Sequence, residues 1–241
     1  MASTPNAVSP KWPKRPPTLT PEQEHARERF MLLWHEQLPT RYSIIERFNH
    51  RSVTGLPDRP ATLKTLEIGA GIGGHLPFED LSRQEYHCLE LREELCAILE
   101  SLDGIASVCA ANIENRTPFD DGSFDRVVAI HVLEHIRNLP SAIVEVGRIL
   151  ADDGFFDVVL PCEGGLAYSL ARQVSAKRFF EKTFGMSYDP IIANEHVNTL
   201  DDVVEELSHV FIVESARRFP LNVPIDTINL CVAFRLRKRR A

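Results

Sequence analysis

A glycine-rich loop directly follows an apolar run in the first half of the chain. Its sequence is "LEIGAGIGGHL" at residues 66–76. Glycine adopts positive φ at little cost and lets a ligand approach the backbone, while a following helix directs its N-terminal N–H groups at that ligand. The spacing Gly-x-Gly-x-x-Gly, formed by Gly69, Gly71 and Gly74, therefore predicts a nucleotide-binding turn.

Two carboxylates indicate which nucleotide this turn holds. Glu67 stands just before the first glycine, and Glu90 ends the next predicted strand. A carboxylate at Glu67 would repel a pyrophosphate, because like charges ~4 Å apart cost several kcal/mol once they are partly desolvated. S-adenosylmethionine carries an ammonium and a sulfonium but no phosphate, and its ribose hydroxyls suit an acceptor such as Glu90. A dinucleotide oxidoreductase is the weaker alternative, since Glu90 also stands where a dinucleotide site has its acidic residue.

The segment "HVLEH" at residues 131–135 places two histidines and a glutamate close together. It matches a zinc-peptidase pattern formally, but no further acidic ligand is evident nearby. We interpret His135 as packing beneath the loop and His131 as lining the pocket, and we predict no metal ligands. A metal role for the acidic and histidine residues of this motif is the weaker alternative. Three side chains are candidates for taking a proton from an acceptor, namely His131, Glu163 and His196.

The elements that position these residues alternate between apolar strands and helical segments from about residue 63. Such alternation predicts a parallel sheet with helices on both faces. Two further strands, separated by a short Pro-containing loop, permit an antiparallel pair. The expected parallel strands are 62–68, 85–91, 105–112, 124–130 and 154–160, and the expected pair is 211–219 with 227–238.

The sequence also predicts how the chain is divided. Thr20 is expected to cap a helix through a capping box with Gln23, and a second helix is expected after Pro39. The proline-rich and polar start of the chain predicts disorder. The predicted units are a disordered tail (1–20), an N-terminal helical cap (21–60), a cofactor-binding core (61–162), a helical acceptor lid (163–198) and a C-terminal part of the core (199–241).

Composition excludes several classes of function. The formal net charge of −7 argues against a protein that wraps nucleic acid. The five cysteines show no Cys-x-x-Cys spacing, which favours a reduced, cytoplasmic protein. No apolar run approaches the length of about 18 residues that a membrane span needs. The terminal "RLRKRR" could contact anionic lipid weakly, but a solvated tail is favoured.

The chain resembles the class I S-adenosylmethionine-dependent methyltransferases, small-molecule branch, over about residues 63–161. The resemblance includes the loop "LEIGAGIGGHL", the acidic strand end of "YHCLEL", and the stretches "TPFDDGSFDRVVAIHVLEHI" and "VGRILADDGFFDVVLP". It implies an α/β, Rossmann-like fold with a mostly parallel seven-stranded sheet, an antiparallel last strand and helices on both faces. It also implies S-adenosyl-L-methionine as cofactor and S-adenosyl-L-homocysteine as product.

The resemblance implies roles for residues at the ends of four strands. Glu67 would lie near the amino group of the cofactor, Glu90 would bind the ribose hydroxyls, and Leu91 would cover the adenine. Asn112 stands where the family more often has Asp. The complete set expected to bind the cofactor is Glu67, Gly69, Ala70, Gly71, Gly73, Glu90, Leu91, Asn112, Ile113, Ile130 and His131.

The acceptor is not named by the sequence. We expect a small-molecule or glycan-type acceptor, methylated at oxygen. The acceptor could be anionic, because the lid segment carries four basic residues, Arg172, Lys177, Arg178 and Lys182. A cofactor-binding relative that has lost catalysis and acts by protein association is the alternative, and the oligomeric state is open.

Overall fold

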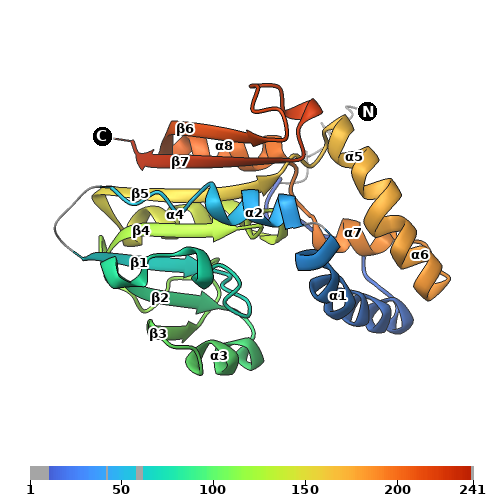
Figure 1. The fold of residues 1–241 in the computed structure, drawn as a ribbon, viewed down its shortest axis with the longest axis horizontal. Coiled ribbons are helices and arrows are strands. Elements are labelled where there is room, and N and C mark those ends of the chain that lie inside the picture. The colour runs from blue at the N-terminus through green and yellow to red at the C-terminus, as the bar shows by residue number, and fades with distance from the viewer. Residues whose placement is uncertain (1–10, 42, 58–61, 240–241) are drawn as a thin grey trace, which may run out of the picture.

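A seven-stranded sheet in the order β3-β2-β1-β4-β5-β7-β6 forms the centre of the protein (Figure 1). The computed structural model describes residues 11–41, 43–57 and 62–239, without the side chains of residues 34–41. Pairings β1–β2, β2–β3, β1–β4 and β4–β5 are parallel, and β7 is antiparallel to both β5 and β6. The predicted fold class, including the antiparallel last strand, is confirmed. The strands are β1 (Leu63–Ile68), β2 (Gln84–Glu90), β3 (Ile105–Ala110), β4 (Phe124–Ile130), β5 (Leu150–Pro161), β6 (Phe211–Phe219) and β7 (Cys231–Lys238).

The strand β5 begins four residues before its predicted start. Phe124 of β4 pairs with Leu150, whereas Arg126 pairs with Phe155, so the register shifts between these two pairs. The four residues 151–154 of β5 thus lie opposite the single residue Asp125 of β4, a surplus of three. Gly154 approaches Asp125 too closely for a side chain. The "ADDG" sequence of this irregular part lacks the apolar character that identified the remainder of the strand.

The larger core lies on one face of the sheet, beneath α4 (Leu139–Ile149) and α8 (Leu200–Val210). Alternate residues of the central strands point into it, among them Leu66 of β1 and Val127 of β4. Thr199 begins α8 through a capping box with Asp202. This core fixes the two central strands, whose carboxyl ends carry most of the predicted site.

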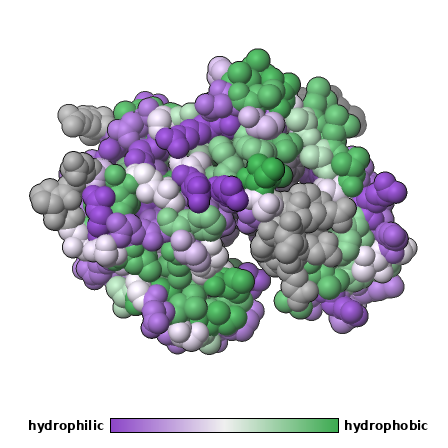
Figure 2. Space-filling view, viewed as in Figure 1, coloured by the Kyte–Doolittle hydropathy of each residue, from purple (hydrophilic) through white to green (hydrophobic). Residues whose placement is uncertain are grey.

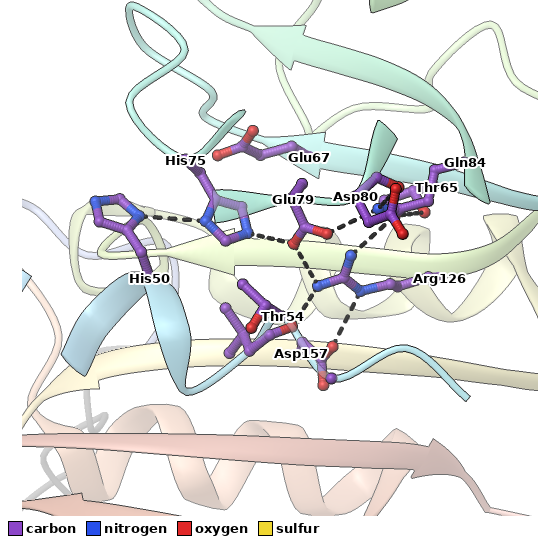
Figure 3. A network of polar contacts seen from close by, with 12 residues as sticks. His50, Thr54, Thr65, Glu67, His75, Glu79, Asp80, Gln84, Arg126 and Asp157 are labelled. Atoms are coloured by element: carbon purple, nitrogen blue, oxygen red, sulfur yellow. Dashed lines mark hydrogen bonds and ion pairs between the residues drawn. The ribbon is translucent and has the colours of Figure 1, made fainter. Parts of the chain in front are cut away.

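The opposite face carries α2 (Ser43–Arg51) and α3 (Glu93–Glu100) and a buried polar network (Figure 3). Arg126 of β4 is fully buried at its centre and donates to Asp157 at 3.1 Å, Gln84 at 3.0 Å and Glu79 at 2.9 Å. It also donates to the carbonyl of Val53, which follows α2. Because buried charges persist only when paired and hydrogen-bonded, this network ties α2 to three strands and to the loop after β1.

The network ends in two histidines. His75 Nε2 lies 2.7 Å from the carboxylate of Glu79, and His75 Nδ1 lies 3.2 Å from His50 Nδ1. His75 belongs to the glycine-rich loop and His50 to α2, so the N-terminal helices contact the loop after β1 directly (Figure 3).

The N-terminal segment differs from the predicted disordered tail where the structure describes it. Trp12 donates to Glu206 at 2.9 Å, and Lys14 pairs with Asp202 at 3.0 Å, both on α8. The apolar ring and the two ion-pairing lysines of "KWPK" supply contacts that a composition argument overlooks. Residues 1–10 of the predicted tail lie outside the described residues.

The first helix begins where the sequence predicted. Thr20 and Gln23 exchange the two hydrogen bonds of a capping box at the start of α1 (Pro21–Arg41). The helix continues through Pro39, which the sequence analysis took as the break between two helices, and α2 follows. A proline within a last turn removes one hydrogen bond without ending the helix.

The helices after β5 pack against α1. Phe180 and Tyr188 lie in ring contact with Phe30 of α1, at centroid distances of 5.3 and 5.5 Å. These helices and α1 thus share a small apolar core and form a helical unit beside the carboxyl ends of the parallel strands (Figure 1). The unit is completed by α5 (Leu166–Arg172), a π-helical turn (Gln173–Lys177), α6 (Arg178–Phe184) and α7 (Asp189–Glu195).

The basic segment 235–238, near the end of the chain, belongs to strand β7 of the sheet. Arg235 donates to Asp157 at 2.7 Å, Arg237 pairs with Glu214, and Lys238 pairs with Asp152. These pairs neutralise much of the charge that suggested a contact with anionic lipid. Across the described residues, every helix is too short or too polar to cross a bilayer.

Candidate functional site

The turn after β1 has the backbone conformation that its glycines allow. Gly69, Gly71 and Gly73 all have positive φ, at 66°, 59° and 79°. A Cβ at Gly69 would lie 2.7 Å from a methyl carbon of Val132, so this position needs both the conformation and the space that glycine provides. Ala70, between the first two glycines, is buried. The loop therefore passes close to the end of β4 and leaves its backbone open to a ligand.

Glu90, at the carboxyl end of β2, faces this turn. Its carboxylate accepts from the backbone N–H of Gly71 at 3.0 Å, and from those of Leu91 and Arg92 at 3.0 and 3.1 Å. The side chain is buried, whereas Leu91 beside it is 65% exposed. This arrangement suits an acceptor for two hydroxyls next to an apolar side chain that can cover a flat ring.

Glu67 lies beneath the same turn, near the end of β1. It is buried and accepts a hydrogen bond from the Tyr86 hydroxyl at 2.9 Å. Burial raises the pKa of Glu67 to about 8, and the Tyr86 hydrogen bond offsets only part of that rise. The site thus holds a carboxyl group that a neighbouring cation can ionise.

The end of β3 supplies the next edge. Asn112 accepts from the backbone N–H of Glu114 at 2.9 Å through its side-chain oxygen, and Ile113 is buried beside it. The amide nitrogen of Asn112 is a donor, so it can meet a ring nitrogen acceptor. The carboxyl ends of β1, β2 and β3 therefore gather the residues expected to bind the cofactor.

The end of β4 is backbone-strained. Ile130 ends β4, and His131 directly after it has φ of 53°, a conformation uncommon outside glycine. His131 Nδ1 lies 3.1 Å from the carboxylate of Glu134. Although burial opposes it, contacts with Cys231 and Glu134 raise the pKa of His131 well above its usual value. These contacts favour the protonated form of His131.

Glu163 and His196 meet across the site. His196 Nδ1 lies 3.0 Å from one carboxylate oxygen of Glu163, and Arg172 donates to the other at 2.5 Å. Burial raises the pKa of Glu163, but His196 and Arg172 outweigh it and lower the pKa below its usual value. An ionised Glu163 therefore orients the His196 ring and leaves its Nε2 free to meet an acceptor.

Two of the four lid cations are paired with carboxylates. Arg172 contacts Glu163, and Lys177 lies 2.6 Å from Asp189. Arg172 is thus better described as a residue that positions Glu163 than as part of an anion-binding surface.

Sequence reasoning missed the contribution of Glu134 and misjudged His135. His135 does not simply pack beneath the loop, because its ring lies edge-on to His196 with centroids 4.9 Å apart. Glu134 is 2% exposed and joins His131 to this pair. The "HVLEH" motif was the available signal, but the partner His196 is distant in sequence and only the fold brings it near.

The combined site has two halves at one edge of the sheet. One half is suited to a nucleoside with a cationic amino-acid portion and consists of the glycine turn, Glu67, Glu90 and Asn112. The other half lies beyond the end of β4 and consists of titratable side chains, namely His131, Glu134, His135, Glu163 and His196. The surface in Figure 2 is hollowed between the sheet and the helical unit, at the edge where the strands end. The site lies beside β1 and β4, where the strand order reverses and α/β sheets bind ligands.

Comparison with known proteins identifies the architecture. Residues 66–158 match the family model described as a methyltransferase domain. A solved S-adenosylmethionine-dependent methyltransferase from Thermotoga maritima, described as a possible histamine N-methyltransferase, is 19% identical with a TM-score of 0.58. That alignment covers 89% of this chain and 99% of that one. A comparison with curated protein sequences finds no match.

Two further solved structures share the fold. A TehB-like S-adenosylmethionine-dependent methyltransferase from Corynebacterium glutamicum is 13% identical, with a TM-score of 0.58 and coverage of 90% and 100%. A geranyl diphosphate C-methyltransferase from Streptomyces coelicolor, solved with Mg²⁺ and S-adenosyl-L-homocysteine, is 14% identical. Its TM-score is 0.52, with coverage of 82% of this chain and 76% of that one. At these identities the solved structures establish the fold.

Proposed function

We propose that this chain, a class I S-adenosylmethionine-dependent methyltransferase, transfers the methyl group to an oxygen of a small-molecule or glycan-type acceptor. The family match supports the enzyme class and the cofactor that the glycine loop and Glu67 predicted. No comparison favours the dinucleotide oxidoreductase. Carbon methyltransferases are among the solved relatives of the fold, so the acceptor atom has to be argued from the site itself.

The single observation that carries the oxygen assignment is the 3.0 Å contact between His196 and Glu163. A hydroxyl acceptor must lose a proton during transfer, and it needs a partner that faces its oxygen. His196 Nε2 is suited to this position because Nδ1 is engaged by a carboxylate. Against the effect of burial, contacts with Cys231 and Glu134 raise the pKa of His131, the other histidine candidate, and favour its protonated form, which cannot accept a proton.

The cofactor half would act mainly by positioning. Methyl transfer is an in-line displacement at a carbon that the sulfonium already activates, so alignment supplies much of the rate. Glu67 would pair with the ammonium of the cofactor, Glu90 would accept from the ribose hydroxyls, and Leu91 would cover the adenine. The glycine turn would let the methionine portion approach the backbone.

The helices of residues 163–198 would form the acceptor lid. Glu163 and His196 lie at its two ends, and Arg172 within it holds Glu163. The exposed apolar side chains Leu166 and Leu170 recur on α5, and Figure 2 shows apolar surface over this region. This supports an acceptor of mixed polar and apolar character, while the paired lid cations give no support to an anionic one.

The reaction is proposed to take place in the cytoplasm. The five cysteines, of which four are buried, are all free thiols, and unpaired thiols are usual in reducing compartments.

The experiment that tests the proposed function is turnover of methyl-labelled cofactor with fractionated cell extract. We expect label in a small-molecule or glycan fraction, with the methyl group on oxygen, and loss of this label in His196→Ala. His209→Ala is the matched control, since His209 is exposed at the end of α8, outside the site. Cofactor binding without any labelled product would favour the alternative of a catalytically inactive relative.

A further inference from the structure

Three side chains beyond the end of β4 lie close enough to share an ion. Glu134 and His135 come from the short 3₁₀ helix η3 (Leu133–His135), and His196 directly follows α7. Each offers one ligand atom, and these atoms lie within 4.8 Å of one another. Metal–ligand distances of about 2.0–2.2 Å keep any two ligands within roughly 4.4 Å, so only small side-chain movements separate the cluster from binding geometry.

The hydrogen bonds of the two histidines direct a lone pair toward this cluster. His135 Nδ1 lies 2.8 Å from the backbone carbonyl of Glu195, which can only accept, so Nδ1 carries the proton. His196 Nδ1 donates in the same way to the carboxylate of Glu163. Both Nε2 atoms are therefore left as lone-pair donors. Metal-ligating histidines usually give their other N–H to a carbonyl or carboxylate in this manner.

Glu134 completes the donor set. One carboxylate oxygen contacts His131, whereas Oε2 is buried and has no hydrogen-bond partner among the described residues. Leaving a buried charged oxygen unsatisfied costs at least about 1–3 kcal/mol, and a bound cation would remove that cost.

The backbone holds the two segments together independently of any ion. The carbonyl of Glu134 accepts from the N–H groups of Val197 and Asn198 at 2.9 and 3.1 Å. The Asn198 side chain donates to the carbonyls of Leu133 and Ile136, at 2.8 and 2.7 Å. His196 is thus fixed beside η3, and the three donors are arranged before a ligand arrives.

We propose that Glu134, His135 and His196 bind one divalent transition-metal ion, with Zn²⁺ as the ion to test first. Two imidazole nitrogens and one carboxylate oxygen form a donor set that zinc and its neighbours in the first transition series prefer, and three protein ligands leave a coordination position open. This deepens the proposed function, on which only the use of the open position depends. With the ion bound, the Nε2 lone pair of His196 would be engaged by the metal. The acceptor hydroxyl would occupy the open position, where the ion would lower the pKa of that hydroxyl so that its proton passes to solvent. It departs from the sequence prediction that the site holds no metal.

The experiment measures metal binding apart from catalysis. The full chain, freed of metal with a chelator, is titrated with Zn²⁺ by calorimetry and with Co²⁺ by visible absorption. We expect one ion per chain and Co²⁺ bands typical of low coordination number. His135→Gln and Glu134→Gln should each weaken binding at least about tenfold, whereas His209→Gln should bind as the parent does.

Circular dichroism and denaturant unfolding show whether each variant is folded. A second pair of measurements, cofactor affinity and product formation with and without chelator, separates this inference from the proposed function. Stoichiometric binding that depends on the cluster supports the metal site even if no methylated product is found. Absence of saturable binding, or equal binding in the parent and in His135→Gln, overturns the metal site and leaves the methyltransferase proposal standing.

Discussion

Glu67 should make cofactor binding depend on pH in a way that can be calculated. Its pKa of about 8 in the free protein means that it is largely uncharged at pH 7. The ammonium of S-adenosylmethionine, if bound beside it as proposed, favours the ionised form and lowers that pKa. Binding below pH 8 must then release a proton from Glu67, and affinity must rise with pH.

The magnitude follows from the pKa. Ionising a group one unit below its pKa costs about 1.4 kcal/mol, which is a factor of ten in affinity. Between pH 5.5 and 7, where the cofactor ammonium stays charged, affinity should rise roughly thirtyfold, close to the limit of tenfold per pH unit for one proton. Close to one proton should be released per cofactor bound over this range.

Calorimetry in buffers of different ionisation enthalpy measures both the cofactor affinity and the number of protons released on binding. Glu67→Gln keeps an oxygen that can accept the Tyr86 hydrogen bond but removes the titration, so its affinity should be weaker at pH 7 and nearly independent of pH. If the parent protein shows flat affinity and no proton release across this range, the placement of Glu67 beside the ammonium is wrong. If the cofactor affinity of Glu67→Gln depends on pH as strongly as that of the parent, the proton released on binding comes from another group.

Three further changes have expected outcomes. Glu90→Ala should weaken cofactor binding by about 2–3 kcal/mol in calorimetry, because a charge-assisted pair of hydrogen bonds to the ribose is lost; unchanged affinity in a folded variant would contradict the predicted pose. His196→Ala should lower the methylation rate by about two orders of magnitude with little change in cofactor affinity, and full activity would remove His196 from the site. Arg126→Ala should lower the free energy of unfolding in urea by about 3–5 kcal/mol, because it leaves buried carboxylates without their partner. Arg116→Ala, at an exposed ion pair, is the control and should change it little; equal effects would contradict the role of burial.

The central strands were predictable from the sequence because they are buried on both faces. Residues 124–130 are continuous enough in apolar and β-branched residues for their limits to agree with β4. The limits of 211–219 also agree with β6, although this edge strand is mostly exposed. The glycine turn was equally readable, since positive φ at Gly69 and Gly73 leaves few other residues possible. Local chemistry was therefore enough to predict the turn on which the proposed cofactor half of the site is built.

The remainder depends on contacts between segments distant in sequence. His196 meets Glu163 and His135 only because α7 returns the chain to the end of β4. From the sequence alone, the charged side chain of Arg126 would be expected at the surface of its strand. It is fully buried, because its hydrogen-bond partners come from four other segments. The order of residues 11–20 likewise depends on α8, at the far end of the chain. No local pattern contains that information.

The contact between His50 and His75 makes the N-terminal helices the place where acid should first loosen the molecule. Two Nδ1 atoms 3.2 Å apart can share one proton, but a second proton would set two positive rings against each other. Burial lowers the pKa of His75 below 6.5, so the unfolded chain binds this proton more readily and stability falls as pH drops through that value. His75 directly follows the glycine turn. The contact between α2 and this loop, which acid weakens, lies next to the proposed cofactor site. Loosening of the fold in mild acid should therefore begin next to the cofactor site.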